Sequence, residues 1–136
     1  FRWKGENVAT TQVEAVIDKW PQISEAIVYG VRVPGSEGRC GMARVILHPG
    51  EELDLRGFAD HLRKELPRYA VPRFLRLGRD VELTGTFKHR KGPLKDQGFD
   101  LEQIEEPVLV LATSDPQWRE LTPEITRQIA AGEVRL

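Results

Sequence analysis

The residues with the clearest chemical potential lie late in the chain, in the stretch TGTFKHRK at residues 84–91. A Thr-Gly-Thr turn there precedes Lys88, His89, Arg90 and Lys91. The stretch lacks the Gly-x-x-x-x-Gly-Lys-Ser/Thr pattern of a phosphate-binding P-loop. A lysine just beyond a turn can nevertheless reach a developing negative charge as a mobile point charge. The alternative is a solvated surface cluster, because isolated motif matches have a high false-positive rate.

Other candidate residues give weaker signals. The stretch KGEN at 4–7 places a glycine at a turn, where backbone can approach a ligand closely. The two prolines of LPRYAVPR, 66–73, predict a rigid connection. His48 and His61 lack the paired spacing of metal ligands, so we expect no metal site. Cys40 has no evident base beside it and is interpreted as a small strand residue.

The composition is that of a soluble globular domain. The chain has 136 residues, of which 40% are hydrophobic and 30% charged, and a formal net charge of −1. That balance argues against a nucleic-acid-binding module, which needs a concentrated basic face. The single cysteine cannot form an internal disulfide, which suits a reducing cytoplasm. The chain opens at Phe1 in the middle of a hairpin-like pattern, so we expect it to be part of a longer protein.

Several amphipathic helices are predicted to position these residues. Thr11-x-x-Glu14 matches a capping box and predicts a helix over 11–20 that Pro21 ends. Asp54 introduces a second helix that ends at Pro67. A short basic helix is predicted around 91–96, and Thr122-Pro123 introduces a last one that stops at Gly132.

Alternating and β-branched segments predict short strands. They lie at 26–34, 42–48, 73–77 and 108–112, and the first two are joined through the turn region 35–41. The stretch 113–121 is predicted to be the loosest. Together these elements predict one small α+β domain with a largely antiparallel sheet flanked by helices.

Taken in order, several segments resemble the C-terminal domain of acyl-CoA synthetases. They are FRWKGENVATTQVEAVI, VYGVRVPGSEGRCGMA, KELPRYAVPRFLRL, TGTFKHRKGPLKDQGFD and IAAGEVRL. The chain looks most like the fatty-acid transport protein and very-long-chain acyl-CoA synthetase branch of the adenylate-forming, or AMP-binding, superfamily. The resemblance covers nearly all of residues 1–136 and implies that they form a mobile C-terminal domain.

This resemblance implies a fatty acid–CoA ligase as the full-length protein. Such enzymes use ATP and Mg²⁺ to join a fatty acid to AMP, and then pass the acyl group to CoA after the C-terminal domain has rotated. The partner implied is the protein's own N-terminal AMP-binding domain, which this chain lacks together with the hinge, so the 136 residues alone should be inactive. The resemblance also implies a cytoplasmic protein, with peripheral contact at the inner face of a membrane through the missing domain. The alternative is a non-catalytic fatty-acid transport or partner-docking module, against which retention of the catalytic lysine would argue.

The resemblance also assigns roles to individual residues. Lys88 falls on the family's adenylation lysine, with Phe87 in place of the glycine usual in other branches. Gly5 matches the segment that lines the pantetheine channel, flanked by Lys4 and Trp3. Arg63 matches an arginine that contacts CoA phosphate in some relatives. Arg90, Lys91 and Lys95 are interpreted as solvated surroundings of Lys88, or as charges that attract ATP or CoA.

Overall fold

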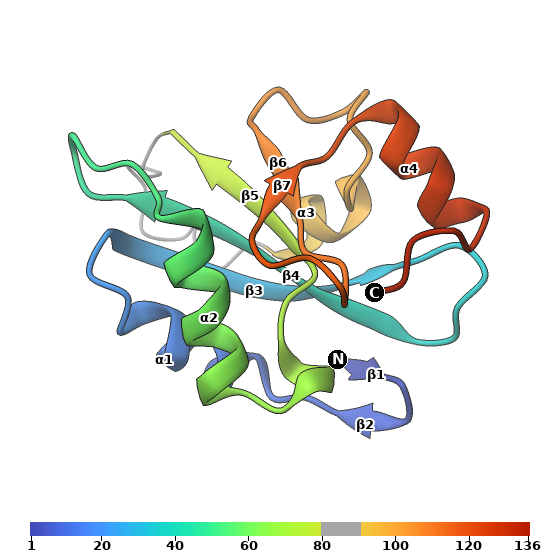
Figure 1. Cartoon of the computed structure of the whole chain (residues 1–136), viewed down its shortest axis with the longest axis horizontal. Coiled ribbons are helices and arrows are strands. Elements are labelled where there is room, and N and C mark those ends of the chain that lie inside the picture. The colour runs from blue at the N-terminus through green and yellow to red at the C-terminus, as the bar shows by residue number, and fades with distance from the viewer. Residues whose placement is uncertain (80–90) are drawn as a thin grey trace.

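The computed structural model describes residues 1–79 and 91–136, and its centre is a five-stranded mixed sheet (Figure 1). The strand order is β3-β4-β5-β6-β7, and a separate two-stranded hairpin, β1-β2, precedes it in the chain. Three of the four pairings are antiparallel, and only β4 and β5 run parallel. The predicted class, a largely antiparallel sheet flanked by helices, is therefore confirmed.

The strands are β1 Arg2–Trp3, β2 Glu6–Asn7, β3 Ile23–Arg32, β4 Arg39–Leu47, β5 Phe74–Gly78, β6 Val108–Val110 and β7 Arg119–Glu120. The helices are α1 Thr10–Asp18, α2 Leu55–Glu65, α3 Lys91–Gln97 and α4 Pro123–Ala130, with a 3₁₀ turn, η1, at Arg68–Ala70. The strands predicted at 26–34 and 42–48 are thus each displaced toward the N-terminus. Residues 39–41, predicted as turn, pair with β3 as the start of β4.

The sheet buries apolar side chains on both faces. On one face, residues of α1 and α2 such as Ile17 and Phe58 pack against Val28, Val45 and Leu75. On the other face lies a second core, which includes Trp3, Tyr29, Met42, Phe74, Phe99, Ile129 and Leu136. Figure 1 shows α1 and α2 on one side of the strands and α3 and α4 on the other. The domain therefore has three layers, with α1 and α2 on one face of the sheet and α3 and α4 on the other. Trp3 and Leu136, from the two ends of the chain, both pack in the second core.

The capping box predicted at Thr11 and Glu14 is wrong. Helix α1 begins at Thr10, and Ala9 precedes it without a side-chain cap. Glu14 Oε2 instead accepts a hydrogen bond from Val28 N of the edge strand β3, at 2.8 Å. A tertiary partner therefore takes the carboxylate that the local pattern assigned to the helix end. The helix also ends earlier than predicted, and Trp20 lies beyond it with its ring 5.3 Å from that of His61.

The helix predicted around 91–96 is present as α3, and the two helix starts predicted from Asp54 and Thr122 are confirmed by side-chain caps. Asp54 Oδ1 accepts a hydrogen bond from Gly57 N at 3.0 Å, at the start of α2. Thr122 Oγ1 accepts from Ile125 N at 3.2 Å, with Pro123 in the first turn of α4. Both caps are local, so their residue spacing alone was sufficient to predict them.

The stretch 113–121 is not loose as predicted. It contains β7, which pairs with β6, and Trp118, whose side chain is 0% exposed. The Trp118 ring stacks on Phe58 of α2, with centroids 6.2 Å apart. The prediction failed because most residues of this stretch are small or polar, which is typical of a loop, and the sequence did not show that its one tryptophan is buried.

We expect Asp54→Ala to lower the free energy of unfolding of this chain by ~1 kcal/mol, because it leaves Gly57 N at the start of α2 without its acceptor. Chemical denaturation of both proteins measures the difference. Asp60→Ala, an exposed position within α2, is the matched control and should change stability much less. Equal losses for the two variants would show that the Asp54 cap contributes nothing specific.

Candidate functional site

The hairpin β1-β2 presents Lys4 and Gly5 at an exposed tip. Both have positive φ, 52° for Lys4 and 81° for Gly5, as a two-residue type I′ turn requires. A Cβ built on Gly5 meets no atom within 4 Å. At Gly5 the tip is thus bare backbone facing open space.

Trp3 fixes this hairpin to the body of the domain. Its side chain is 3% exposed and packs in the second core with Val33 and Leu136. Trp3 also forms a bridge to Gly38, where φ is 77° and a side chain would collide with the Arg2 carbonyl oxygen. Trp3 therefore lies beneath the tip, and its ring centroid is 5.8 Å from Lys4 Nζ.

Beside the hairpin, five basic residues form what we call the cationic cluster: Lys4, Arg63, Arg68, Arg73 and Arg135. Burial and the positive charges of the Arg73, Arg68 and Arg135 guanidiniums lower the pKa of Lys4. Burial, together with the charges of Arg63 and Arg68, lowers the pKa of Arg73 to about 10. The cluster is therefore a region of mutual repulsion that a bound anion would relieve.

Backbone carbonyls hold the two central arginines of the cationic cluster. Arg73 is 2% exposed, and its guanidinium donates to Arg68 O at 3.1 Å and to Leu111 O at 3.4 Å. Arg63 donates to Ala112 O at 3.0 Å and also to Asp115 O. A cavity of about 240 Å³ opens between them, lined by Arg63, Arg68, Val71, Arg73 and Thr113. Neutral carbonyls orient the arginines without cancelling their charge.

Lys88 lies outside the described residues, as do residues 84–87, His89 and Arg90. Lys91 begins α3 and is not merely solvated: its Nζ donates to Thr10 Oγ1 at 3.2 Å and lies 3.7 Å from Glu14 Oε2. Lys95, one turn on, is exposed. The start of α3 is thus attached to α1.

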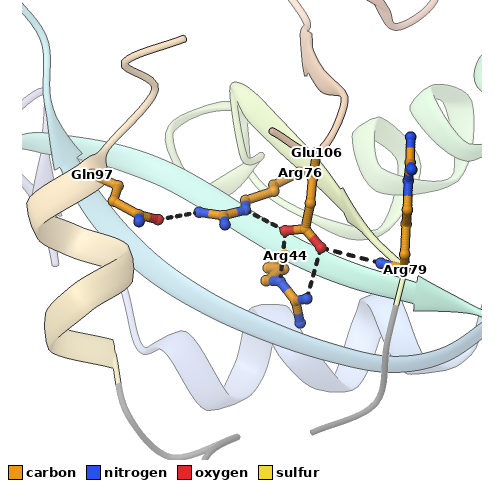
Figure 2. Close-up of polar contacts among 5 residues, drawn as sticks. All are labelled: Arg44, Arg76, Arg79, Gln97 and Glu106. Carbon is orange, nitrogen blue, oxygen red and sulfur yellow. Dashed lines mark hydrogen bonds and ion pairs between the residues drawn. The ribbon is translucent and has the colours of Figure 1, made fainter. Parts of the chain in front are cut away.

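On the other side of that segment, the Glu106 carboxylate joins three elements (Figure 2). Its Oε1 accepts from Arg76 Nε at 2.5 Å and Arg44 Nε at 3.1 Å. Its Oε2 accepts from Arg44 Nη2 at 2.8 Å and Arg79 N at 3.1 Å. Arg76 Nη1 then donates to Gln97 Oε1 of α3 at 2.5 Å. We call these five residues the Glu106 network.

The Glu106 carboxyl is ionised at neutral pH. Burial opposes its charge, but hydrogen bonds from Arg44 and Arg76 outweigh that effect and hold the pKa of Glu106 below its ordinary value of 4.5. The side chains of Glu106, Arg44 and Arg76 are 16%, 13% and 11% exposed, so water screens these contacts only weakly.

The surroundings of the remaining candidate residues, Cys40 and His61, suit structural roles. Cys40 is buried in β4, and burial raises the pKa of its thiol to about 12. His61 Nε2 donates to Val16 O at 2.8 Å. Within residues 1–79 and 91–136, no group of three or more His, Cys, Asp or Glu side chains could hold a metal ion. Over the same residues, no helix has the length and apolar character needed to cross a bilayer.

Comparison with known protein families identifies the domain. Residues 12–88 match the AMP-binding enzyme C-terminal domain family, a range whose last residue is Lys88. The chain belongs to that family.

The chain is similar to proteins named as long-chain fatty acid transport proteins and to one named as a fatty-acid–CoA ligase. It is 48% identical over 136 residues to long-chain fatty acid transport protein 6 of Mus musculus, covering all of this chain and 22% of that protein. It is 42% identical over 132 residues to the medium/long-chain-fatty-acid–CoA ligase FadD6 of Mycobacterium tuberculosis, covering 97% of this chain and 22% of the ligase. The chain therefore spans about a fifth of the length of these relatives.

Solved structures share the fold. Coronafacic acid ligase from Pectobacterium brasiliense superposes with a TM-score of 0.67 at 17% identity, over 82% of this chain and 21% of that one. The amide bond synthetase McbA from Marinactinospora thermotolerans gives 0.56 at 27% identity, over 67% and 20% of the two chains.

The sequence patterns pointed to the hairpin and Arg63 as candidates but not to the basic residues that lie near them. Arg68 and Arg73 lie in the segment interpreted only as a rigid connection, and Arg135 is near the end of the chain. Two arginines within an eight-residue stretch were the available signal. Glu106 gave no signal, since its partners Arg76 and Arg44 are 30 and 62 residues away.

The lowered pKa of Glu106 predicts a pH-dependent contribution to stability. Glu106→Gln should lower the free energy of unfolding most above about pH 5, where the carboxyl is ionised in folded and unfolded chains alike. Because the unfolded carboxyl takes up its proton first as the pH falls, the contribution of wild-type Glu106 is lost as the pH falls through its lowered folded pKa.

Urea denaturation of both chains, from about pH 7 to about pH 3, should therefore show the two stabilities converging in acid. Glu105→Gln makes the same change at an exposed neighbour and should have little effect at any pH. A Glu106→Gln deficit that did not narrow in acid would argue against the ion pairs as its source.

Proposed function

We propose that this chain is the mobile C-terminal domain of an AMP-forming fatty acid–CoA ligase. The observation that carries the proposal is the exposed Gly5 backbone next to Lys4 and the other basic residues of the cationic cluster, in a chain of this family. Coenzyme A combines a slender neutral pantetheine arm with a phosphorylated nucleotide. The glycine at the tip leaves room for the arm, and nearby guanidiniums suit the phosphates. The 42% identity to a protein named as a fatty-acid–CoA ligase supports the fatty acid as substrate.

On this proposal, the N-terminal AMP-binding domain supplies what the chain lacks. ATP, Mg²⁺ and the fatty acid would be held mainly by that domain, and the 136 residues alone would catalyse neither half-reaction. We also propose a cytoplasmic location, with any membrane contact made through the other domain. No nucleic acid is proposed as a partner, because the net charge is −1.

On the CoA side, Gly5 would line the pantetheine channel, with Lys4 at its mouth and Trp3 holding the hairpin from beneath. Arg63 would contact phosphate together with Arg68 and Arg73, around the cavity that they share. The carbonyls of Ala112 and Asp115 preorient Arg63, which reduces the conformational entropy lost when an anion binds.

In the adenylation half-reaction, Lys88 would contact the fatty-acid carboxylate and the α-phosphate. Negative charge accumulates there as the carboxylate attacks, and a positioned ammonium stabilises it. Since the two half-reactions need different groups, rotation of the domain would exchange Lys88 for the hairpin tip.

The second candidate function is a non-catalytic fatty-acid transport or partner-docking module. Relatives named as long-chain fatty acid transport proteins favour it. The presence of Lys88 at the adenylation position favours the ligase. The same experiment separates the two candidates.

In the full-length protein, Lys88→Ala should slow adenylate formation by ~10²–10³-fold, the range for removing one electrostatic stabiliser of a transition state. Pyrophosphate release from fatty acid and ATP measures this step. Thioester formation from supplied acyl-adenylate and CoA should remain near normal. Lys64→Ala, at an exposed lysine of α2, is the control and should change neither step appreciably. Normal adenylation by Lys88→Ala, or none by the wild type, would refute the ligase proposal in this form.

At the hairpin, Gly5→Leu should impair thioester formation more than adenylation, because its side chain would obstruct the pantetheine arm. Gly5→Ala is the matched control: φ of 81° strains both variants, but only leucine adds bulk. Thioester rates from supplied acyl-adenylate should fall in the order glycine, alanine, leucine. Equal losses for alanine and leucine would indicate backbone strain and not a blocked channel.

A further inference from the structure

The stretch 111–115, directly after β6, is bonded to three of the five residues of the cationic cluster. Leu111 and Arg73 exchange two hydrogen bonds: Leu111 N donates to Arg73 O at 2.9 Å, and Arg73 Nη1 donates to Leu111 O at 3.4 Å. Thr113 donates to Arg135 O from its backbone N at 2.9 Å and from its Oγ1 at 3.1 Å. The rest of the stretch holds Arg63. Residues that are far apart in the sequence are thus joined at this one stretch.

Asp115 closes this stretch into a turn. Its backbone N donates to Ala112 O at 3.0 Å, and its Oδ2 accepts a hydrogen bond from Ala112 N, also at 3.0 Å. Arg119 Nε donates to the same Asp115 oxygen at 3.0 Å. The Asp115 side chain is 15% exposed, so water competes for these bonds only weakly. One carboxylate therefore fixes both ends of the turn 112–115.

The closed turn offers Arg63 a pair of acceptors. Arg63 Nη1 donates to Asp115 O, and Arg63 Nη2 donates to Ala112 O at 3.0 Å. A guanidinium is planar and its N–H groups point in fixed directions, so it needs two oxygens at a fixed separation. The bonds between Ala112 and Asp115 set that separation. Because a guanidinium has five N–H donors, these two contacts leave others for an anion.

We propose that Asp115 is the positioning residue for Arg63 in the binding of a CoA phosphate. This inference rests on the role of Arg63 under the proposed function. By closing the turn 112–115, Asp115 holds the Arg63 guanidinium at the cavity of about 240 Å³ that Thr113 and Arg73 also line. Asp115 does not contact the phosphate in this arrangement. It acts through the two carbonyl oxygens that orient Arg63.

An acidic residue beside an anion site needs its charge offset, and Arg119 does this. The Arg119 guanidinium forms an ion pair with the Asp115 carboxylate at 3.0 Å. Arg63, in contrast, contacts the backbone oxygen of Asp115, and within residues 1–79 and 91–136 it forms no ion pair with a carboxylate. Asp115 therefore orients Arg63 and leaves its positive charge available to a phosphate.

Arg63 and its support come from different parts of the chain. Arg63 lies in the last turn of α2, inside residues 12–88 that match the family model, whereas Ala112 and Asp115 lie outside that range. An arginine side chain has many rotamers, and ordering such a side chain on binding reduces affinity. The C-terminal part of this chain would remove that cost before CoA arrives.

The test uses the full-length protein and thioester formation from supplied acyl-adenylate. Asp115→Ala should raise KM for CoA by about 3- to 10-fold, the effect of ordering one long side chain anew, and leave kcat and adenylate formation within about twofold of wild type. Pantetheine carries the same thiol without phosphates, so Asp115→Ala and the wild type should use it equally well. Asp115→Asn should recover most of the affinity for CoA, because its amide oxygen can accept from both Ala112 N and Arg119 Nε.

Two further variants serve as controls. Asp100→Ala opens another turn that a side chain closes, in which Asp100 Oδ1 accepts from Glu102 N at 3.0 Å, and it should leave KM for CoA unchanged. The double variant Arg63→Ala/Asp115→Ala should have no higher KM for CoA than Arg63→Ala alone, because a residue that acts through Arg63 then has nothing left to position.

Equal losses with CoA and pantetheine, or a further rise of KM in the double variant, would mean that Asp115 only stabilises the fold. A raised KM in Arg63→Ala beside a normal KM in Asp115→Ala would overturn the positioning role and leave the proposed function intact. A normal KM for CoA in Arg63→Ala would overturn the CoA-binding role of Arg63 itself. If Asp115→Ala does not fold, Asp115→Glu decides, since it keeps the charge beside Arg119 but its longer side chain does not fit the turn, and it should raise KM for CoA alone.

Discussion

The structure depends on burying strand β4 on both of its faces. Ala43 and Val45 point toward α1 and α2, and Cys40 and Met42 toward the second core, so each layer of the molecule is needed to keep this strand from water. Arg44 is the one charged residue in its interior. A half-buried guanidinium at the centre of a sheet needs an anionic partner, and Glu106 supplies it from a distant part of the chain. Because β4 is buried on both faces, Arg44 needs the ion pair that the Glu106 network provides.

Both candidate functional regions are attached to this sheet by groups that restrict their motion. Trp3 joins the hairpin tip to the second core, and backbone carbonyls orient Arg63 and Arg73. Under the proposed function, in which the domain exposes different faces in two half-reactions, such rigidity would have a purpose. Rotation would then exchange one preformed surface for another, and neither surface would have to become ordered again in each catalytic cycle.

The sequence predicted what local chemistry determines. Asp54 and Thr122 cap helices through contacts three residues away, and strand-like patterns located β3, β4, β5 and β6, but not β7, to within a few residues. Long-range partners account for the errors. Glu14 serves β3 and Lys91 instead of its own helix, and Trp118 anchors a stretch whose composition is that of a loop. The role of Glu106 rests on a pairing across 30 and 62 residues, for which a single sequence gives no periodic signal.

The segment after α3 does more than extend the sheet by β6 and β7. Its Glu106 holds Arg44 and Arg76, and its Ala112 and Asp115 carbonyls hold Arg63. Its final residue, Leu136, packs in the same core as Trp3 beneath the hairpin. One continuous stretch therefore contacts strands β4 and β5, an arginine of the cationic cluster and the core beneath the hairpin. Since β6 pairs with β5, any displacement of this stretch would be transmitted to all three, which gives the domain a physical reason to behave as a single rigid body.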